Sequence, residues 1–290
     1  MVQRSTRLRK LLRGDKIIVA PGAFDALSAT LIEQSGFPAI YITGAGVASS
    51  RLGVPDIGLV TMTEVLETAK NIINATTVPV ICDIDTGHGN ALNLMRTVRE
   101  FENIGIAGLQ VEDQITPKRC GHTDGKQLIS KEEMVKKIEA FQNAKQSEEL
   151  VLIARTDAIA VNSFEDAIDR AKAYIEAGAD VLFIEAPRSI SEMKRIAEIF
   201  QGTPLLINNV EGGKTPLLPV EELDRMGFRI AIYPTSAWMS ALKAMQGVLR
   251  ELKERGSTSG YLDRMVSFEE MFEIVGLSKY RALENKYLTL

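Results

Sequence analysis

Short apolar runs rich in β-branched residues recur along the chain, and amphipathic segments separate them. Apolar runs of about four to eight residues are typical of buried strands, whereas apolar spacings of three and four residues are typical of helices. The strand-like runs lie at residues 16–20, 39–43, 78–83, 108–112, 151–155, 181–185, 204–208 and 230–234. The helical patterns lie at residues 25–36, 63–75, 91–105, 130–145, 163–178, 189–201, 219–227, 235–256 and 267–288. The alternation predicts an α/β fold, a (β/α)8 TIM barrel with an additional C-terminal helix, and an open doubly wound sheet is the alternative.

A chain of 290 residues has room for two domains, but α/β barrels of about 250 residues form a single one. No Pro- or Ser-rich linker and no shift of composition marks a boundary, so we expect one barrel domain over residues 1–290, including the helix at 267–288. Residues 1–14 are basic and lack the apolar core of a secretory signal. We interpret them as a helical cap over the barrel, with a mitochondrial presequence as the alternative.

The composition is that of an ordinary globular protein, with 45% hydrophobic residues and a formal net charge of −4. This charge gives no general attraction for nucleic acid or for an anionic membrane, and no apolar stretch is long enough for a membrane span. The cysteines and histidines (Cys82, His88, Cys120 and His122) match neither a disulfide framework nor a zinc-finger pattern. A reducing, cytoplasmic location therefore fits best.

Polar residues gather where the predicted strands end, which is the end of a TIM barrel that carries the active site. They are Thr43, Gly44, Asp83, Asp85, Glu112, Asp113, Arg155, Asp157, Glu185 and Asn208, with Asp56 in the long loop after the second strand. Taken alone, Asp113 and Asp157 are interpreted as helix N-caps. The whole set of carboxylates would repel itself unless a cation compensates it.

Hard oxygen ligands without clustered His or Cys favour Mg²⁺, with Mn²⁺ as the alternative. We therefore expect Asp83 and Asp85 to hold a divalent ion that Asp56 and Glu112 reach directly or through water. Arg155 offers a bidentate fork for a substrate carboxylate or phosphate. Its alternative role is a salt bridge to neighbouring carboxylates.

Two further segments carry candidate chemistry. Residues 44–49 depart from the dinucleotide-binding G-x-G-x-x-G pattern, so a turn whose backbone N–H groups face an anion is the simpler interpretation. Residues 117–126 form a long polar loop with two glycines as candidate hinges. Its Cys120 is flanked by Lys118, Arg119 and His122, so we expect a lowered thiol pKa and a reactive cysteine. The alternative is an exposed basic loop with an incidental thiol.

At three segments the sequence resembles the isocitrate lyase and phosphoenolpyruvate mutase superfamily. They are DIDTGHGN at 83–90, VEDQ at 111–114 and KRCGH at 118–122, and the last is typical of the carbon–carbon lyase branch. The resemblance extends over nearly the whole chain. It implies a Mg²⁺-dependent lyase that cleaves a 2-hydroxy di- or tricarboxylate, by retro-aldol/Claisen chemistry, into a 2-oxo acid and a carboxylate. It also implies a homotetramer, a dimer of dimers, in which the C-terminal helix is exchanged between subunits.

The resemblance also bears on the substrate. Superfamily members that cleave 2-methylisocitrate have two arginines and a threonine where this chain has Met239, a position near Phe268, and Val210. Burying a substrate carboxylate without such partners would cost roughly several kcal/mol of binding free energy. The departure favours a dicarboxylate such as 2,3-dimethylmalate, which would give pyruvate and propionate. The alternatives are 2-methylisocitrate, then hydrolysis or decarboxylation of oxaloacetate, and, from another class, a catalytically silent binding or scaffold protein.

Roles for individual residues follow from the same resemblance. Thr43, Gly44 and Ala45 would hold the carboxylate of the 2-oxo acid, and Tyr41 or a metal-ligating carboxylate would take the hydroxyl proton. Cys120 would protonate the enolate on carbon. The charge of the enolate would be stabilised by Arg155, Asn208, Gly121 and His122, and the substrate pocket would also be lined by Glu185, Val210 and Pro234.

Overall fold

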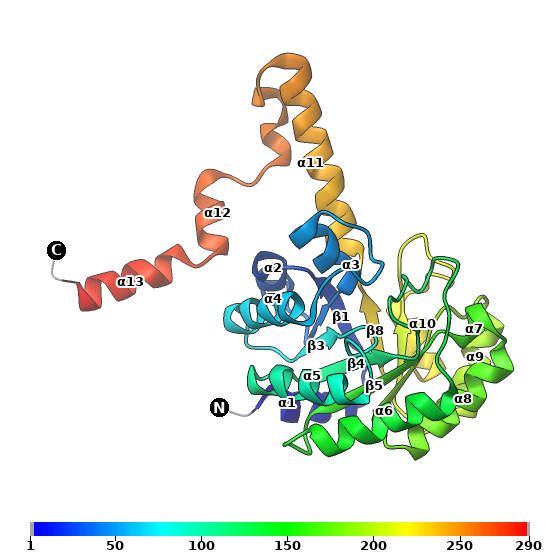
Figure 1. The fold of residues 1–290 in the computed structure, drawn as a ribbon. Helices are drawn as coiled ribbons and strands as arrows, with labels where there is room; N and C mark the ends of the chain where they lie inside the picture. The colour runs from blue at the N-terminus through cyan, green and yellow to red at the C-terminus, as the bar shows by residue number, and fades with distance from the viewer. Residues whose placement is uncertain (1–2, 289–290) are drawn as a thin grey trace. The chain divides into compact units, whose positions relative to one another are not determined.

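The computed structural model describes residues 3–288, and in it eight parallel strands close into a barrel in chain order (Figure 1). The strands are β1 (Ile18–Ala23), β2 (Ile40–Ile42), β3 (Val80–Asp83), β4 (Gly108–Glu112), β5 (Val151–Thr156), β6 (Val181–Ile184), β7 (Leu205–Asn208) and β8 (Ile230–Tyr233). Pairing of β1 with β8 closes the ring, with Ile18 opposite Ile230. The predicted (β/α)8 barrel is confirmed, and each predicted strand lies within a few residues of its observed position.

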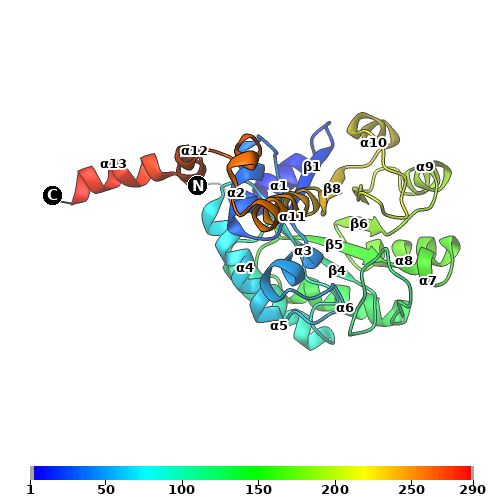
Figure 2. The same cartoon turned by 90° about the horizontal axis from the view of Figure 1, so that it is seen from above.

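Helices surround the barrel and connect its strands (Figure 2). They are α1 (Arg4–Leu12), α2 (Ala26–Gln34), α3 (Gly44–Val47), the π-helix η1 (Ala48–Leu52), α4 (Met62–Ala75), α5 (Ala91–Asn103), α6 (Lys131–Ala144), α7 (Ala158–Val161), α8 (Phe164–Glu176), α9 (Ile190–Ile199) and α10 (Val220–Met226). The short helices α3, η1 and α7 were not predicted. Among residues 3–288, no helix is both long and apolar enough to cross a membrane.

Side chains alternate between the inside of the barrel and the layer beneath the helices. In β5, Val151 and Ile153 belong to the inner cluster, whereas Leu152 and Ala154 belong to the outer one. This period of two follows from the pleat of a strand. Strands that are buried on both faces have continuous apolar sequences, which is why the eight runs could be recognised.

The N-terminal helix α1 contributes to the inner core. Leu8 is fully buried in the inner cluster, with Leu11 and Leu12 packed beside it. Arg9 forms an ion pair with Asp180 at 2.9 Å, between its Nη1 and a carboxylate oxygen. The predicted helical cap over the barrel is therefore confirmed.

The chain divides into two compact units, Met1–Ser236 and Ala237–Leu290, and the first contains the complete barrel. The second contains most of α11 (Ser236–Arg255), then the 3-10 helix η2 (Ser259–Arg264), α12 (Phe268–Ile274) and α13 (Leu277–Tyr287). The single helix predicted at 267–288 was wrong, because Gly276 adopts a left-handed conformation (φ +81°) and separates α12 from α13. That residues 1–290 form one domain stays a prediction.

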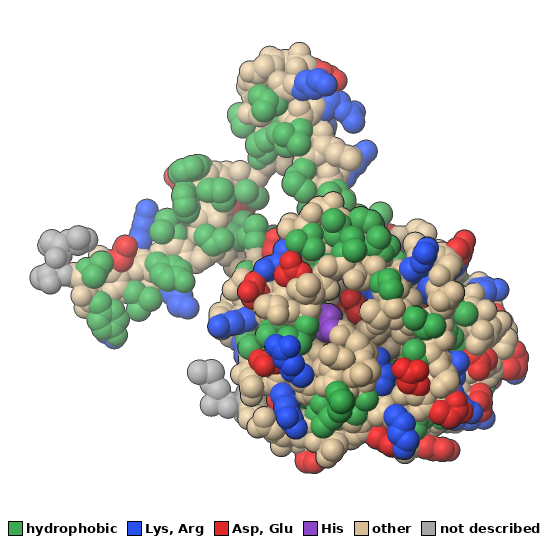
Figure 3. All heavy atoms as spheres, in the orientation of Figure 1, with side chains coloured by type: hydrophobic (Ala, Val, Ile, Leu, Met, Phe, Trp, Pro, Cys, Tyr) green, Lys and Arg blue, Asp and Glu red, His purple; other side chains and the backbone are tan. Residues whose placement is uncertain are grey.

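The C-terminal unit has an unusual surface. None of the residues in α11, η2, α12 or α13 is buried. Large hydrophobic side chains are instead exposed along these helices, and Figure 3 shows many of them on the face in view. The exchange of a C-terminal helix between subunits also stays a prediction.

Candidate active site

The candidate residues occupy inward-facing positions at the carboxyl ends of the strands. In β3, Ile81 faces the barrel interior and Cys82 faces the helices, so Asp83 faces inward again. The same alternation directs Arg155 inward after Val151 and Ile153. It also applies to Tyr41, Thr43, Glu112, Glu185 and Asn208. The fold thus brings the predicted strand-end residues to one mouth of the barrel.

One side of this mouth is an acidic cluster consisting of Asp56, Asp83 and Asp85. The ammonium of Lys118 lies between two of these carboxylates, 2.5 Å from Asp56 Oδ1 and 2.8 Å from Asp85 Oδ1. Asp83 Oδ1 accepts hydrogen bonds from the backbone N–H of Asp85 and from Gln110. Burial, followed by the charge of Asp85, raises the pKa of Asp83 to about 6. The cluster therefore has more negative charge than Lys118 alone neutralises.

The oxygen donors at this side of the mouth fit a hard cation. Both carboxylate oxygens of Glu112 are buried without a hydrogen-bond partner in the described chain, and burial raises the pKa of this group well above its usual range. Within residues 3–288, no three His, Cys, Asp or Glu side chains are gathered as direct ligands of one ion. Because Mg²⁺ usually keeps several waters and takes only one or two protein carboxylates, the pair Asp83 and Asp85 suits that ion.

The other side of the mouth is organised around Arg155. Its Nε and Nη2 donate to the two carboxylate oxygens of Asp157 at 3.0 and 3.1 Å. Its Nη1 lies 3.2 Å from Glu112 Oε2, and its Nη2 lies 3.5 Å from Glu185 Oε2. The guanidinium stacks over the ring of Phe183, 5.2 Å from the ring centre. The salt bridges considered as the alternative role of Arg155 are thus present, and they fix the orientation of its fork.

The segment after β2 is the first turn of a helix. The hydroxyl of Thr43 caps α3 by accepting from the N–H of Gly46 at 3.4 Å. The N–H groups of Gly44 and Ala45 lie in this first turn, where no intrahelical acceptor exists for them. A Cβ on Gly44 would lie 3.3 Å from Asp83 Oδ2, so the turn adjoins the acidic cluster. The geometry suits a carboxylate bound beside a cation.

Tyr41 lies within the barrel beneath these groups. Its hydroxyl donates to Gln110 Oε1 at 2.7 Å, and Gln110 in turn donates to Asp83. Burial, followed by the charge of Asp83, raises the pKa of Tyr41 well above its usual range. Tyr41 is thus placed to orient Gln110 and Asp83, and this environment disfavours it as a base.

The loop at 117–126 covers this mouth, with Gly121 against the Arg155 side. A Cβ on Gly121 would lie 2.4 Å from Arg155 Nη2 and 2.8 Å from Glu185 Cγ, so only glycine permits this approach. Cys120 is half-buried. The lowered thiol pKa predicted from its basic neighbours was wrong: burial raises the pKa, and a backbone hydrogen bond with His122 only partly offsets it. One reason is that Lys118 directs its charge to the acidic cluster.

His122 connects this loop to β6 and β7. The backbone N–H of Lys214 donates to His122 Nδ1 at 3.0 Å, and Nε2 lies 3.4 Å from Glu185 Oε1 and 3.1 Å from Asn208 Nδ2. Asn208 also donates to Glu185 Oε2 at 3.2 Å. Burial opposes ionisation of Glu185, but Arg155 and then His122 lower its pKa to about 2. Glu185 is therefore an anion that holds both polar groups.

The apolar residues expected to line the substrate pocket lie in different units. Val210 is buried, and a Cβ on Gly213 would lie 2.4 Å from its Cγ1 and 2.9 Å from His122 Nδ1. Pro234 is buried at the end of β8, where a Cβ on Gly22 would collide with its backbone. Val210 and Pro234 thus belong to the mouth of the barrel.

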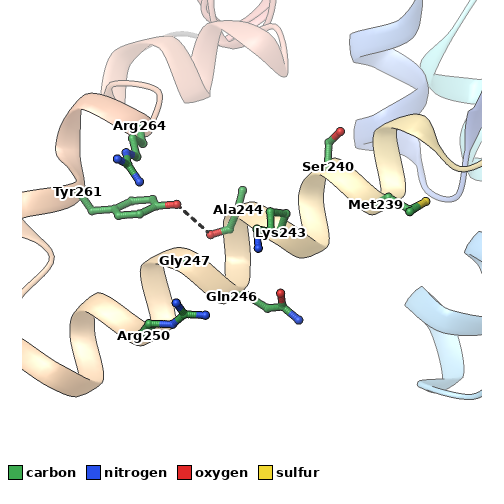
Figure 4. A pocket seen from close by; sticks show the side chains of 9 residues that line it. All are labelled: Met239, Ser240, Lys243, Ala244, Gln246, Gly247, Arg250, Tyr261 and Arg264. Carbon is green, nitrogen blue, oxygen red and sulfur yellow. Dashed lines mark hydrogen bonds between the residues drawn. The ribbon is translucent and has the colours of Figure 1, made fainter. Parts of the chain in front are cut away.

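Met239 and Phe268 belong to the C-terminal unit. Met239 lines a cavity of about 670 Å³ there, together with Lys243, Arg250, Tyr261 and others (Figure 4). The hydroxyl of Tyr261 donates to the carbonyl of Ala244 at 3.4 Å across this cavity. Phe268 packs edge-to-face on Phe272. A role of Met239 and Phe268 in substrate selection stays a prediction.

Two of the interpretations from sequence were wrong. Asp157 occupies the predicted N-cap position, at the start of α7, but its side chain makes no cap hydrogen bond there, because it accepts from Arg155. Asp113 accepts from Thr156, Tyr174 and the N–H of Asp157, and α6 begins with Ser130 as its cap instead. These carboxylates fix the strand that carries Arg155.

Sequence reasoning also missed several buried polar residues that shape the mouth: Gln110, Gln114 and Lys126. Gln114 holds the backbone of Arg119 through two hydrogen bonds of 2.9 Å. The sequence indicates a role for these residues only through their place in the segments 108–114 and 118–126, which also contain the predicted site residues Glu112 and Cys120.

A TIM barrel with an acidic cluster, an inward arginine and a thiol-bearing loop at one mouth is typical of carbon–carbon lyases of the phosphoenolpyruvate mutase and isocitrate lyase superfamily. The chain belongs to the phosphoenolpyruvate phosphomutase family, whose sequence profile matches residues 8–253. It is 48% identical to 2,3-dimethylmalate lyase of Eubacterium barkeri, over 98% of both chains. It is 43% identical to 2-methylisocitrate lyase of Aeropyrum pernix, over 94% of this chain and 87% of that one.

Solved structures agree with this assignment. A crystal structure of 2,3-dimethylmalate lyase superimposes with a TM-score of 0.94 and 37% identity, covering 99% of this chain and 96% of that one. Oxaloacetate acetylhydrolase, bound to 3,3-difluorooxalacetate, superimposes with a TM-score of 0.93 and 36% identity, covering 98% and 97%. The predicted superfamily and the prediction of a carbon–carbon lyase are confirmed.

Proposed function

We propose that the chain is a Mg²⁺-dependent lyase that cleaves 2,3-dimethylmalate to pyruvate and propionate. The observation that carries this substrate is the buried Val210 at the mouth, in contact range of Gly213 and beside His122. A methyl group fits such a surface, whereas a third carboxylate would lose its hydration there without gaining a partner. The relationship to 2,3-dimethylmalate lyase supports the same choice.

Asp83 and Asp85 would hold the Mg²⁺ ion, with Asp56 and Glu112 reaching it directly or through water. When bound, the ion would act as a Lewis acid that lowers the pKa of the substrate's 2-hydroxyl. The surplus of negative charge around Asp83 supports this assignment, and so does the buried Oε1 of Glu112, for which the described residues provide no hydrogen-bond donor. Mn²⁺ could replace Mg²⁺, because it prefers the same ligands.

Substrate binding would use the groups beside the acidic cluster. The N–H groups of Gly44 and Ala45, with Thr43, would hold the carboxylate next to the hydroxyl-bearing carbon. Arg155 would receive the second carboxylate, because its fork is already oriented by Asp157. The two carboxylates would then lie on opposite sides of the bond that breaks.

Cleavage begins when a base removes the proton of the 2-hydroxyl. We assign this step to a carboxylate of the Asp83–Asp85 pair rather than to Tyr41, whose hydroxyl is committed to Gln110. The oxygen then forms the new carbonyl of pyruvate, and the electrons of the C2–C3 bond pass to C3. The product on that side is the enolate of propionate.

The enolate must next be protonated on C3. Cys120 is the donor that we assign, because its raised pKa keeps the thiol protonated at neutral pH. Arg155, His122, Asn208 and the backbone of Gly121 would stabilise the negative charge until the proton arrives. The loop at 117–126 would at the same time keep water away from the enolate.

The proposed function also includes an oligomeric state and a cellular location. We propose a homotetramer in which the C-terminal helices are exchanged, since the side chains of α11–α13 are unburied in the described chain. A cytoplasmic location is supported by the two free cysteines, Cys82 and Cys120, which suit a reducing compartment.

The test is a panel of substrates assayed with Mg²⁺ by release of 2-oxo acid: 2,3-dimethylmalate, 2-methylisocitrate, isocitrate, citramalate and oxaloacetate. We expect kcat/KM for 2,3-dimethylmalate to exceed that for 2-methylisocitrate by about 100-fold, because a carboxylate against Val210 would be uncompensated. A preference for 2-methylisocitrate would overturn the choice of substrate but not the class of reaction.

The second candidate function is hydrolysis of oxaloacetate, which the superposition with oxaloacetate acetylhydrolase favours. It predicts oxalate and acetate as products, whereas decarboxylation would give pyruvate and CO₂. Separation of these products by chromatography distinguishes the candidates. If no substrate of the panel reacts and calorimetry detects no Mg²⁺ binding, the alternative of a silent scaffold would be favoured.

A further inference from the structure

Lys126 is a buried lysine that the proposed mechanism does not use. It ends the loop that carries Cys120, and only 2% of its side chain is exposed. Its ammonium donates to the carbonyl oxygen of Gly121 and lies 3.3 Å from Asp157 Oδ1. We propose that Lys126 is a positioning residue, which fixes Gly121 against Arg155 and thereby sets the places of Cys120 and His122.

Contacts connect Arg155, Asp157, Lys126 and Gly121 in a ring. Asp157 accepts from Arg155 with both oxygens, and Lys126 lies beside one of them. Lys126 in turn holds Gly121, which lies so close to Arg155 that a Cβ on residue 121 would be 2.4 Å from Nη2. The cation on the strand and the cation on the loop are therefore held by the same carboxylate.

The cost of burying the Lys126 ammonium favours one defined position of this side chain. An ammonium that is almost fully buried is costly unless a charge and hydrogen-bond acceptors compensate it. Asp157 is completely buried, and Gly121 offers a backbone acceptor at the centre of the loop. Lys126 contacts both while Gly121 lies against Arg155. Burial of its charge is thus coupled to the position of Cys120, one residue before Gly121.

The test compares Lys126→Gln with the wild type in two assays, one of which does not depend on the proposed function. Alkylation by iodoacetamide, followed by mass spectrometry, reports the access of solvent to Cys120. Cys82 is fully buried and serves as the internal reference. We expect the alkylation rate of Cys120 to rise at least about threefold. We also expect kcat for 2,3-dimethylmalate to fall about 10- to 100-fold with little change in KM, because displacement of a reacting group mainly affects the chemical step.

The matched control is Lys131→Gln, in α6, the helix that follows the loop. Lys131 is partly exposed and pairs with the exposed Asp169 of α8 at 2.6 Å. Exposed pairs contribute little, about 0–1 kcal/mol, so both rates should stay within twofold of the wild type. Lys126→Met keeps the aliphatic stem and serves as a second variant if the glutamine is poorly tolerated. Circular dichroism monitors the fold of each protein.

The outcomes separate the two proposals. Faster alkylation in a folded Lys126 variant supports the positioning role even if the substrate assignment fails. Unchanged alkylation and unchanged kcat in both folded variants would overturn it. Loss of activity that only parallels loss of helical signal, with unchanged alkylation of the folded fraction, would show a purely structural role and would equally overturn it.

Discussion

The two sides of the barrel mouth both contain several carboxylates, but they are neutralised in different ways. On the β3 side, Asp56 and Asp85 share an ammonium that comes from the loop, Lys118. On the β5 side, Asp157 and Glu185 contact Arg155, which belongs to the barrel itself. The first side is therefore suited to an external cation, and the second to an anionic substrate. The comparison teaches that two groups of carboxylates at one mouth can serve opposite purposes, depending on where the cations that neutralise them come from.

The largest effect is expected from breaking the acidic side. Asp85→Asn should lower kcat at least about 1,000-fold and weaken Mg²⁺ binding in calorimetry, because the ion would lose a charged ligand worth several kcal/mol. Asn tolerates the left-handed backbone of residue 85 (φ +51°), so the fold should persist.

Asp169→Asn, at an exposed position on α8, is the matched control and should behave as the wild type. An Asp85→Asn protein that retained both Mg²⁺ binding and turnover would refute the assignment of the acidic side as a metal site.

A smaller effect is expected on the side organised by Arg155. Arg155→Lys keeps the charge but cannot contact Glu112, Asp157 and Glu185 together, since one ammonium lacks the planar fork. Loss of charged hydrogen bonds worth about 1.5–3 kcal/mol each should lower kcat/KM roughly 100-fold.

The control for Arg155→Lys is Arg195→Lys, where an exposed arginine pairs with Glu165. It should leave kcat/KM unchanged. If Arg155→Lys also stayed within threefold of the wild type, the two sides would not differ in the way described.

The smallest effect concerns the thiol between the two sides, and it is a shift in pH dependence. Iodoacetamide reacts with thiolate, so the alkylation rate of Cys120 follows its ionisation. Burial raises the pKa of Cys120 above its ordinary value of 9.0, so the thiol is neutral below that value and ionises only as the pH rises through it. The rate should therefore be low at pH 7 and reach its midpoint above pH 9.

Cys120→Ser should abolish this labelling, because Cys82 is fully buried. A midpoint between pH 7 and 8 would mean that the basic neighbours Lys118 and Arg119 dominate after all. It would also weaken the case for Cys120 as a proton donor.

Much of the fold could be predicted because each strand is buried on both faces and so has a continuous apolar sequence. The strand-end residues followed from the fold, since TIM barrels place their sites at one end. The role of Asp113 could not be predicted, because its partners Arg170 and Tyr174 lie on α8, more than fifty residues further along the chain. Asp157 contacts Arg155, two residues before it, and Lys126, and a sequence pattern does not show that these side chains turn toward it.

The environment of Cys120 was misjudged for a related reason. The ammonium of Lys118 pairs with Asp56 and Asp85, and burial dominates the pKa of the Cys120 thiol. Lys126 looked like an ordinary loop lysine, since its burial depends on Asp157 from another strand. Gly276 is a local signal for the break between α12 and α13. The prediction of one helix over 267–288 ignored this glycine.

The exposure of the C-terminal helices affects how this part of the chain folds. Helices of fewer than about 12 residues are marginal in water unless they are packed against another surface, and α12 and α13 have seven and eleven residues. Phe268 and Met271 are among the apolar side chains that their own chain leaves uncovered. These two helices would then acquire their shape only on encounter with another surface, at a rate that depends on protein concentration.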